Sequence, residues 1–130
     1  MSRFTFVPLQ AVRVIHDRQI ARHGGAPGLR DAGLLEMGCA RALNLDAYDS
    51  PPPELQDIAA AYAFGLTKAH AFVDGNKRTA FVTAVTFLRL NGWYFRPDPL
   101  DGVQMMEGLA SDDVSEATFA AWLKQGMTPL

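Results

Sequence analysis

The stretch His70–Ala80 (HAFVDGNKRTA) combines an imidazole, a carboxylate, an amide and two cations around one glycine. An imidazole can take a proton from a hydroxyl, a carboxylate can hold a divalent cation, and cationic side chains can bind phosphate oxygens. These are the three requirements of phosphoryl transfer. His70 fits the first as a general base, Asp74 fits the second as a magnesium ligand, and Lys77 with Arg78 fit the third.

The segment Gly75–Arg78 lies where a helix is expected to begin. The first turn of a helix leaves N–H groups unpaired, and together with the helix dipole they form an anion site. Lys77 and Arg78 add positive charge at the end where the dipole disfavours it, at a cost of about 0.3–1 kcal/mol per exposed charge. A phosphate gains roughly 1.5–3 kcal/mol per charged hydrogen bond, which outweighs that cost.

A structural interpretation is open for each of these residues taken alone. Asn76 or Asp74 can serve as a helix N-cap with solvated cations beside it, and His70 can cap the carbonyls of the preceding helix. The sequence also lacks the spaced glycine that precedes the Gly-Lys pair of a Walker P-loop. Each residue taken singly is best explained by a structural role. The set as a whole is better explained by a functional site for phosphoryl transfer.

Apolar residues at helical spacing predict about six helices and no convincing sheet, so the expected fold class is all-α. The fourth helix is apolar nearly all round, which is typical of a central helix wrapped by others. The motif loop would then connect two core helices within a single domain, residues 1–130. LDAYDSPPP (Leu45–Pro53) is expected to be a connection. The expected helices are Leu9–His23, one capped by Asp31, one after Pro53, one from about Asn76 to Asn91, Leu100–Ala110 and Ser115–Lys124.

Composition narrows the class of protein further. Nearly half of the 130 residues are apolar and the formal net charge is −2, which favours a folded domain and gives no basic excess for direct nucleic-acid binding. The N-terminus lacks the apolar core of a secretory signal, and no apolar run reaches membrane-spanning length. We therefore expect a cytoplasmic protein that does not interact with membranes.

The remaining histidines and the single cysteine carry no recognisable site. His16 and His23 are expected as ordinary surface or boundary residues, since no cysteine or acidic residue has metal-ligand spacing with them. Cys39 lies in an apolar helical run, where a buried small side chain is expected rather than a nucleophile.

HAFVDGNKR resembles the signature of the Fic/Doc superfamily, His-x-Phe-x-(Asp/Glu)-Gly-Asn-(Gly/Lys)-Arg, and is most similar to its death-on-curing (Doc) branch of toxins. The loop HGGAPGLRD, the FLRLNG helix ending, the length and the helical order resemble that branch as well. The resemblance implies a Fic/Doc fold and a nucleotide substrate, ATP, with Mg²⁺. By match it implies the following roles: base His70, magnesium ligand Asp74, phosphate-binding residues Gly75, Asn76, Lys77 and Arg78, and buried anchor Phe72.

Lys77 stands where adenylylating members usually carry a second glycine. That glycine leaves room for a β-phosphate, whereas members with lysine are understood to bind ATP in the reversed sense and to transfer its γ-phosphate. The resemblance therefore implies a protein kinase whose family target is a threonine of elongation factor Tu, so that translation stops. Transfer of AMP to a protein hydroxyl and a catalytically silent binding module are the alternatives.

The resemblance also implies a partner. Doc toxins are neutralised by a small Phd-like antitoxin whose C-terminal segment folds into a groove near the active site. No self-inhibitory helix with the usual Ser/Thr-x-x-x-Glu-(Gly/Asn) pattern is found in this chain, in agreement with an inhibitor supplied in trans. Arg30 and Asp31, in the GLRD loop, are candidates for holding the target or the motif loop.

Overall fold

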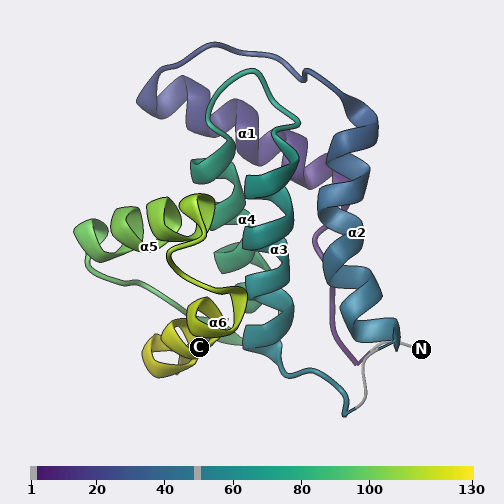
Figure 1. The fold of residues 1–130 in the computed structure, drawn as a ribbon, viewed down its shortest axis with the longest axis vertical. Coiled ribbons are helices and arrows are strands. Elements are labelled where there is room, and N and C mark those ends of the chain that lie inside the picture. The colour runs from purple at the N-terminus through teal and green to yellow at the C-terminus, as the bar shows by residue number, and fades with distance from the viewer. Residues whose placement is uncertain (1–2, 49–50) are drawn as a thin grey trace.

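The computed structural model describes residues 3–48 and 51–130, which form six helices and one short sheet (Figure 1). This arrangement confirms the predicted all-α class. The elements are α1 (Leu9–His23), α2 (Ala32–Tyr48), α3 (Leu55–Ala69), α4 (Asn76–Leu90), β1 (Trp93–Tyr94), α5 (Pro99–Ser111), α6 (Glu116–Gly126) and β2 (Thr128–Pro129). None of the helices in the described ranges is long and apolar enough to cross a membrane.

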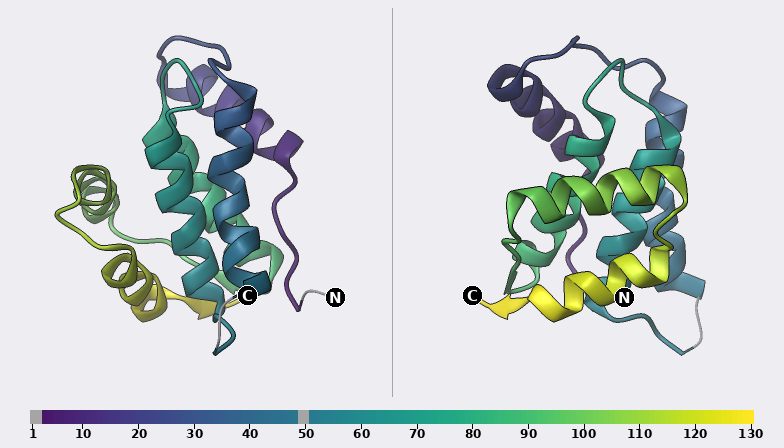
Figure 2. Two further views of the ribbon diagram at one scale, coloured as in Figure 1. Left: turned by 45° about the vertical axis from the view of Figure 1, so that its right-hand side comes forward. Right: turned by 60° about the vertical axis from the view of Figure 1, so that its left-hand side comes forward.

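Helix α3 occupies the centre of the bundle. Every residue from Ile58 to Ala63 is buried, and α3 contacts α2, α4, α5 and α6. Helix α2 lies on one side of it, with α5 and α6 on the other (Figure 2). The expectation that α4 is the central helix is therefore wrong. The alanines of α3 let neighbours approach from all sides, whereas α4 keeps the larger Phe81 and Val82 half-buried on its outer face.

Helices α2 and α3 pack closely because two glycines face each other across their interface. A Cβ atom built on Gly65 would lie 2.3 Å from the carbonyl oxygen of Gly38. No side chain fits at that separation, so the close approach of the two backbones requires glycine at this position.

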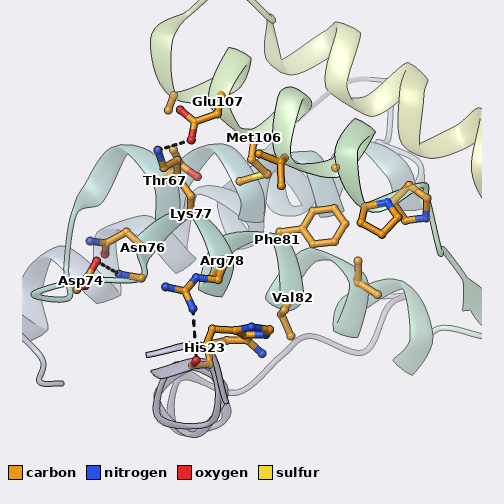
Figure 3. Close-up of a pocket in the computed structure, with 18 of the residues that line it drawn as sticks. His23, Thr67, Asp74, Asn76, Lys77, Arg78, Phe81, Val82, Met106 and Glu107 are labelled. Atoms are coloured by element: carbon orange, nitrogen blue, oxygen red, sulfur yellow. Dashed lines mark hydrogen bonds and ion pairs between the residues drawn. The ribbon is translucent and has the colours of Figure 1, made fainter. Parts of the chain in front are cut away.

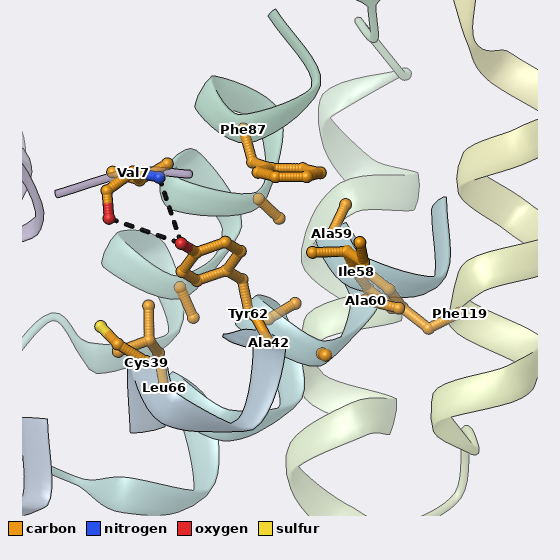
Figure 4. Packing of buried hydrophobic residues seen from close by; sticks show 14 of the residues in the cluster. Val7, Cys39, Ala42, Ile58, Ala59, Ala60, Tyr62, Leu66, Phe87 and Phe119 are labelled. Carbon is orange, nitrogen blue, oxygen red and sulfur yellow. Dashed lines mark hydrogen bonds between the residues drawn. The ribbon is translucent and has the colours of Figure 1, made fainter. Parts of the chain in front are cut away.

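The core joins the N-terminal segment to the central helix. The hydroxyl of Tyr62 accepts a hydrogen bond from the backbone N–H of Val7 at 3.1 Å, and the Tyr62 ring packs against Phe87 with ring centroids 5.5 Å apart (Figure 4). Burial raises the pKa of Tyr62 to about 12. The segment before α1 is thereby fixed to α3, and α1 follows it across the ends of α2 and α4.

Two connections differ from the sequence expectation. Helix α2 continues to Tyr48, so the first residues of LDAYDSPPP are helical, and Asp49 and Ser50 lie outside the described residues. A short sheet forms where none was expected, because β1 after α4 pairs antiparallel with the C-terminal β2 through Trp93 and Pro129. Strands of two residues are too short to show an alternating pattern, so this pairing had no sequence signal.

Candidate active site

The motif loop reverses the chain twice between α3 and α4. His70 ends α3 in the left-handed conformation (φ 50°, ψ 45°), and Gly75 precedes α4 with φ 74°. A left-handed residue with a side chain costs about 1–2 kcal/mol, and such strain gathers at functional sites. The turn leaves the His70 side chain exposed at the wall of a cavity, and the imidazole has no hydrogen-bond partner among the described residues.

Asn76 closes the loop through its side chain. Its Oδ1 accepts from the N–H of Phe72 at 3.0 Å, and its Nδ2 donates to the carbonyl of Phe72 at 2.9 Å. The amide side chain is therefore engaged within the loop. What Asn76 can offer an anion is its backbone N–H.

Phe72 anchors the loop in the core, where its side chain is 4% exposed. The imidazole of His16 stacks on its ring, and His16 Nε2 donates to the backbone carbonyl of Asp74 at 2.8 Å. The expectation that His16 is a surface or boundary residue is therefore wrong, since it is 1% exposed. The signal was present in the sequence, because His16 shares the apolar face of its helix with Val12. His23 is exposed, as expected.

The loop between α1 and α2 holds the motif loop from outside. The Arg30 side chain donates from Nε to the carbonyl of His70 at 2.9 Å, and the backbone N–H groups of Arg30 and Asp31 both donate to the carbonyl of Ala71. Leu29 forms an antiparallel bridge with Phe72. The Asp31 carboxylate caps α2 by accepting from the N–H of Leu34 at 3.0 Å.

The Asp74 carboxylate is held in place by two backbone donors. It accepts from the N–H of Ala26 at 3.1 Å and from the N–H of Gly75 at 2.8 Å. These hydrogen bonds are the main reason why the pKa of Asp74 lies below its ordinary value, because they favour the charged form. The carboxylate is exposed and ionised, and each oxygen keeps a lone pair for a cation.

The first turn of α4 offers open backbone donors. In the described part of the chain, the N–H groups of Asn76, Lys77 and Arg78 have no hydrogen-bond partner, and no side chain caps this helix end. The first backbone donor that is satisfied within the turn is that of Thr79, which donates to the carbonyl of Gly75 at 3.0 Å. The start of α4 is therefore free to bind an anion.

A cavity of about 930 Å³ opens beside this helix end. The two cations of the motif extend to opposite sides of it (Figure 3). Lys77 Nζ forms an ion pair with Glu107 of α5 at 2.7 Å. Arg78 extends toward α1, where its guanidinium lies 3.5 Å from the carbonyl oxygen of Gln19 and 3.4 Å from that of Gly24.

Two further residues of the cavity wall were not identified from the sequence. Glu107 pairs with Lys77 from a helix distant along the chain, and no local pattern predicts such a pair. Thr67 is 1% exposed and lines the cavity, and its hydroxyl has no hydrogen-bond partner among the described residues. A threonine in a helix is usually read as a packing residue, so neither position carried a signal.

The arrangement brings an unpaired imidazole, an ionised carboxylate and open helix amides to one cavity in an all-helical bundle. It can hold an anion and remove a proton next to it. Comparison with known proteins identifies the class, since the model of the Fic/DOC family matches residues 6–88. The chain therefore belongs to the Fic/Doc family.

Two relatives lie in the Doc branch. The chain is 33% identical to "Protein kinase doc" of Escherichia phage P1 over 111 residues, which cover 85% of this chain and 86% of the phage protein. It is 41% identical to "Toxin Doc" of Mycolicibacterium smegmatis over 106 residues, which cover 77% of this chain and 78% of that protein. The resemblance to the Doc branch is thereby confirmed.

Proposed function

We propose that this protein is the toxin of a toxin–antitoxin pair and a protein kinase that transfers the γ-phosphate of ATP to a protein hydroxyl. The single observation that carries the proposal is the set of open N–H groups at Asn76, Lys77 and Arg78, next to the exposed imidazole of His70. The names of the two relatives, a protein kinase and a toxin, support it.

In this proposal the backbone amides and the guanidinium of Arg78 bind the phosphates, and His70 removes the proton of the acceptor hydroxyl. Asp74 holds Mg²⁺, which would neutralise phosphate charge when bound. Among the described residues no group of three or more His, Cys, Asp or Glu side chains comes together. A single carboxylate with phosphate oxygens and water as the other ligands is the usual arrangement for Mg²⁺ with nucleotides.

The implied target is a threonine of elongation factor Tu, with translation arrest in the cytoplasm as the consequence. Incubation of the protein with ATP, Mg²⁺ and elongation factor Tu, followed by mass spectrometry of the factor, tests the reaction directly. One added phosphate supports kinase activity, whereas one added AMP supports the nucleotidyltransferase alternative. An unmodified factor, with no other modified protein in a lysate treated with labelled ATP, argues against both.

His70→Ala separates catalysis from binding. Removal of a general base is expected to lower the transfer rate by about 10²–10⁴ and to abolish growth arrest. His70→Asn is a matched variant, because asparagine tolerates the left-handed backbone of this position but cannot act as the base. If either variant still arrested growth fully, a silent binding module would explain the toxicity better.

Lys77→Gly tests the choice of transferred group. Glycine would remove the side chain that distinguishes this motif from that of adenylylating relatives, so we expect phosphorylation to be lost and adenylylation to become possible. Full kinase activity in Lys77→Gly would remove the argument based on this position.

An antitoxin partner is proposed because part of the cavity wall is apolar. This apolar part lies beyond the charged end of the cavity, and Val103 of α5 remains 59% exposed there. An amphipathic helix of a Phd-like antitoxin could bury this wall while covering the catalytic end. A titration with the antitoxin's C-terminal peptide tests this binding mode. Val103→Asp should weaken the affinity for the peptide at least tenfold, whereas a substitution that reverses a charge at the cavity edge, outside the apolar wall, should not prevent binding. The apolar wall includes Phe81, Val82, Val85, Phe95, Pro97, Pro99, Val103 and Met106.

A further inference from the structure

The ion pair between Lys77 and Glu107 connects the anion site to α5. The two side chains approach to 2.7 Å, and both are well exposed, at 45% and 60%. Lys77 thus presents its backbone N–H at the open first turn of α4 while its ammonium is bound to a carboxylate on another helix. An anion bound at that turn would find the ammonium already occupied.

We propose that Glu107 is a positioning residue that competes with the bound phosphate for the ammonium of Lys77. The proposal rests on the proposed function insofar as nucleotide phosphates are the anion concerned. In the free protein Glu107 holds Lys77 on α5. When a polyphosphate binds at the start of α4, Lys77 exchanges the carboxylate for a phosphate oxygen.

The energetics allow this exchange. An exposed ion pair of this kind contributes a factor of roughly 1.4–5 to an equilibrium constant. A polyphosphate carries several charges and is held by the first-turn amides as well, so it competes successfully with one carboxylate. The Lys77 side chain has a flexible stem of four carbons, so its ammonium can move from Glu107 to a phosphate oxygen without displacement of the helix.

Arg78 provides an internal comparison. Its guanidinium donates to the neutral carbonyl oxygens of Gln19 and Gly24, at 3.5 and 3.4 Å, and its charge helps to lower the pKa of Asp74 without forming an ion pair with it. Of the two motif cations, only Lys77 is paired with an acid in the described structure. Glu107 therefore controls the availability of one cation while the other stays available, and it favours ligands with enough charge to displace it.

The test is a double-mutant cycle on ligand affinity. Dissociation constants for Mg²⁺-ATP and for inorganic tripolyphosphate are measured by calorimetry at low ionic strength, for the wild type, Glu107→Gln, Lys77→Met and the double variant. Glu107→Gln should strengthen binding about 1.4- to 5-fold more when Lys77 is present than when methionine replaces it. The excess should shrink in high salt.

Relief of simple repulsion between Glu107 and phosphate predicts a different result, since it gives the same gain in both backgrounds. An equal gain, no gain or a loss of affinity in Glu107→Gln would each overturn the proposal. Asp101→Asn is the matched control, because it removes one negative charge from the same helix outside the cavity wall. It should leave the dissociation constants unchanged within error.

The two ligands separate this inference from the proposed function. If tripolyphosphate shows the predicted coupling but no protein is phosphorylated, the exchange stands and the kinase proposal fails. If phosphorylation occurs without coupling in the cycle, the kinase proposal stands and the role of Glu107 fails. If the wild type binds neither Mg²⁺-ATP nor tripolyphosphate, both the kinase proposal and the role of Glu107 fail.

Discussion

The imidazole of His16 lies flat on the ring of Phe72, with centroids 3.9 Å apart and an interplanar angle of 9°. Through Nε2 the same imidazole donates to the carbonyl oxygen of Asp74. One buried side chain of α1 therefore contacts both the anchor of the motif loop and the backbone of Asp74, the proposed magnesium ligand, and the loop cannot change its shape without disturbing α1.

We expect His16→Ala to lower the free energy of unfolding by about 2–4 kcal/mol, because it leaves a cavity above Phe72 and removes a hydrogen bond to a backbone carbonyl. Urea denaturation followed by circular dichroism would measure this. His23→Ala, at an exposed position of the same helix, should change the stability by no more than about 0.5 kcal/mol. Equal effects of the two substitutions would contradict the assigned role of His16.

Gly65→Ala should destabilise the protein by about 1–3 kcal/mol or more, since the new methyl group would collide with the backbone of Gly38 and separate α2 from α3. Gly102→Ala is the matched control. A Cβ atom there meets its nearest neighbours at 3.8 Å, so the helix preference of alanine should stabilise α5 by about 0.5–1 kcal/mol. Thermal unfolding of both variants checks the opposite signs.

The carboxylate of Asp74 predicts a component of acid sensitivity. Its pKa is lowered in the folded protein by hydrogen bonds from Ala26 and Gly75. The charged form therefore stabilises the fold above the pKa of an unfolded aspartate, about 3.9, and this contribution is lost as the pH falls through the lower folded-state pKa. Urea midpoints measured from pH 7 to pH 3 should fall less steeply for Asp74→Asn than for the wild type. Parallel curves would argue against this role of Asp74.

Thr83 is fully buried in the face of α4 that meets the core, and its hydroxyl has no hydrogen-bond partner among the described residues. Thr83→Val exchanges this hydroxyl for a methyl group of similar size, so the desolvation cost of an unsatisfied polar group disappears. We expect a gain in stability of about 1 kcal/mol, visible as a higher urea midpoint. A loss of stability would indicate that the hydroxyl is hydrogen-bonded in solution.

Cys39 is expected to be inert in the native protein. Burial raises the pKa of its thiol to about 11, and the thiolate is the reactive form. Labelling with a thiol-specific disulfide reagent at pH 8 should therefore be slow and should proceed only through opening of the structure. Addition of denaturant should make it rapid. Fast labelling without denaturant would show that Cys39 is accessible, contrary to its 6% exposure.

The sequence by itself determined the number and order of the helices and the position of the motif. Apolar spacing and punctuation by proline and glycine placed α1 and α4 correctly, because these signals act between residues a few positions apart. For the same reason HAFVDGNKR could be assigned to the junction of α3 and α4. The Doc resemblance followed from those residues and was confirmed by the comparisons.

Only the tertiary structure decided which residues meet across the chain. His16 contacts Phe72, Arg30 contacts His70, and Lys77 pairs with Glu107. It also made α3 rather than α4 the central helix. Such contacts depend on how helices pack in three dimensions, and side chains distant in sequence leave no periodic trace of a shared contact. The chemistry of the motif could therefore be predicted from the sequence, whereas the distant residues that contact the motif could not.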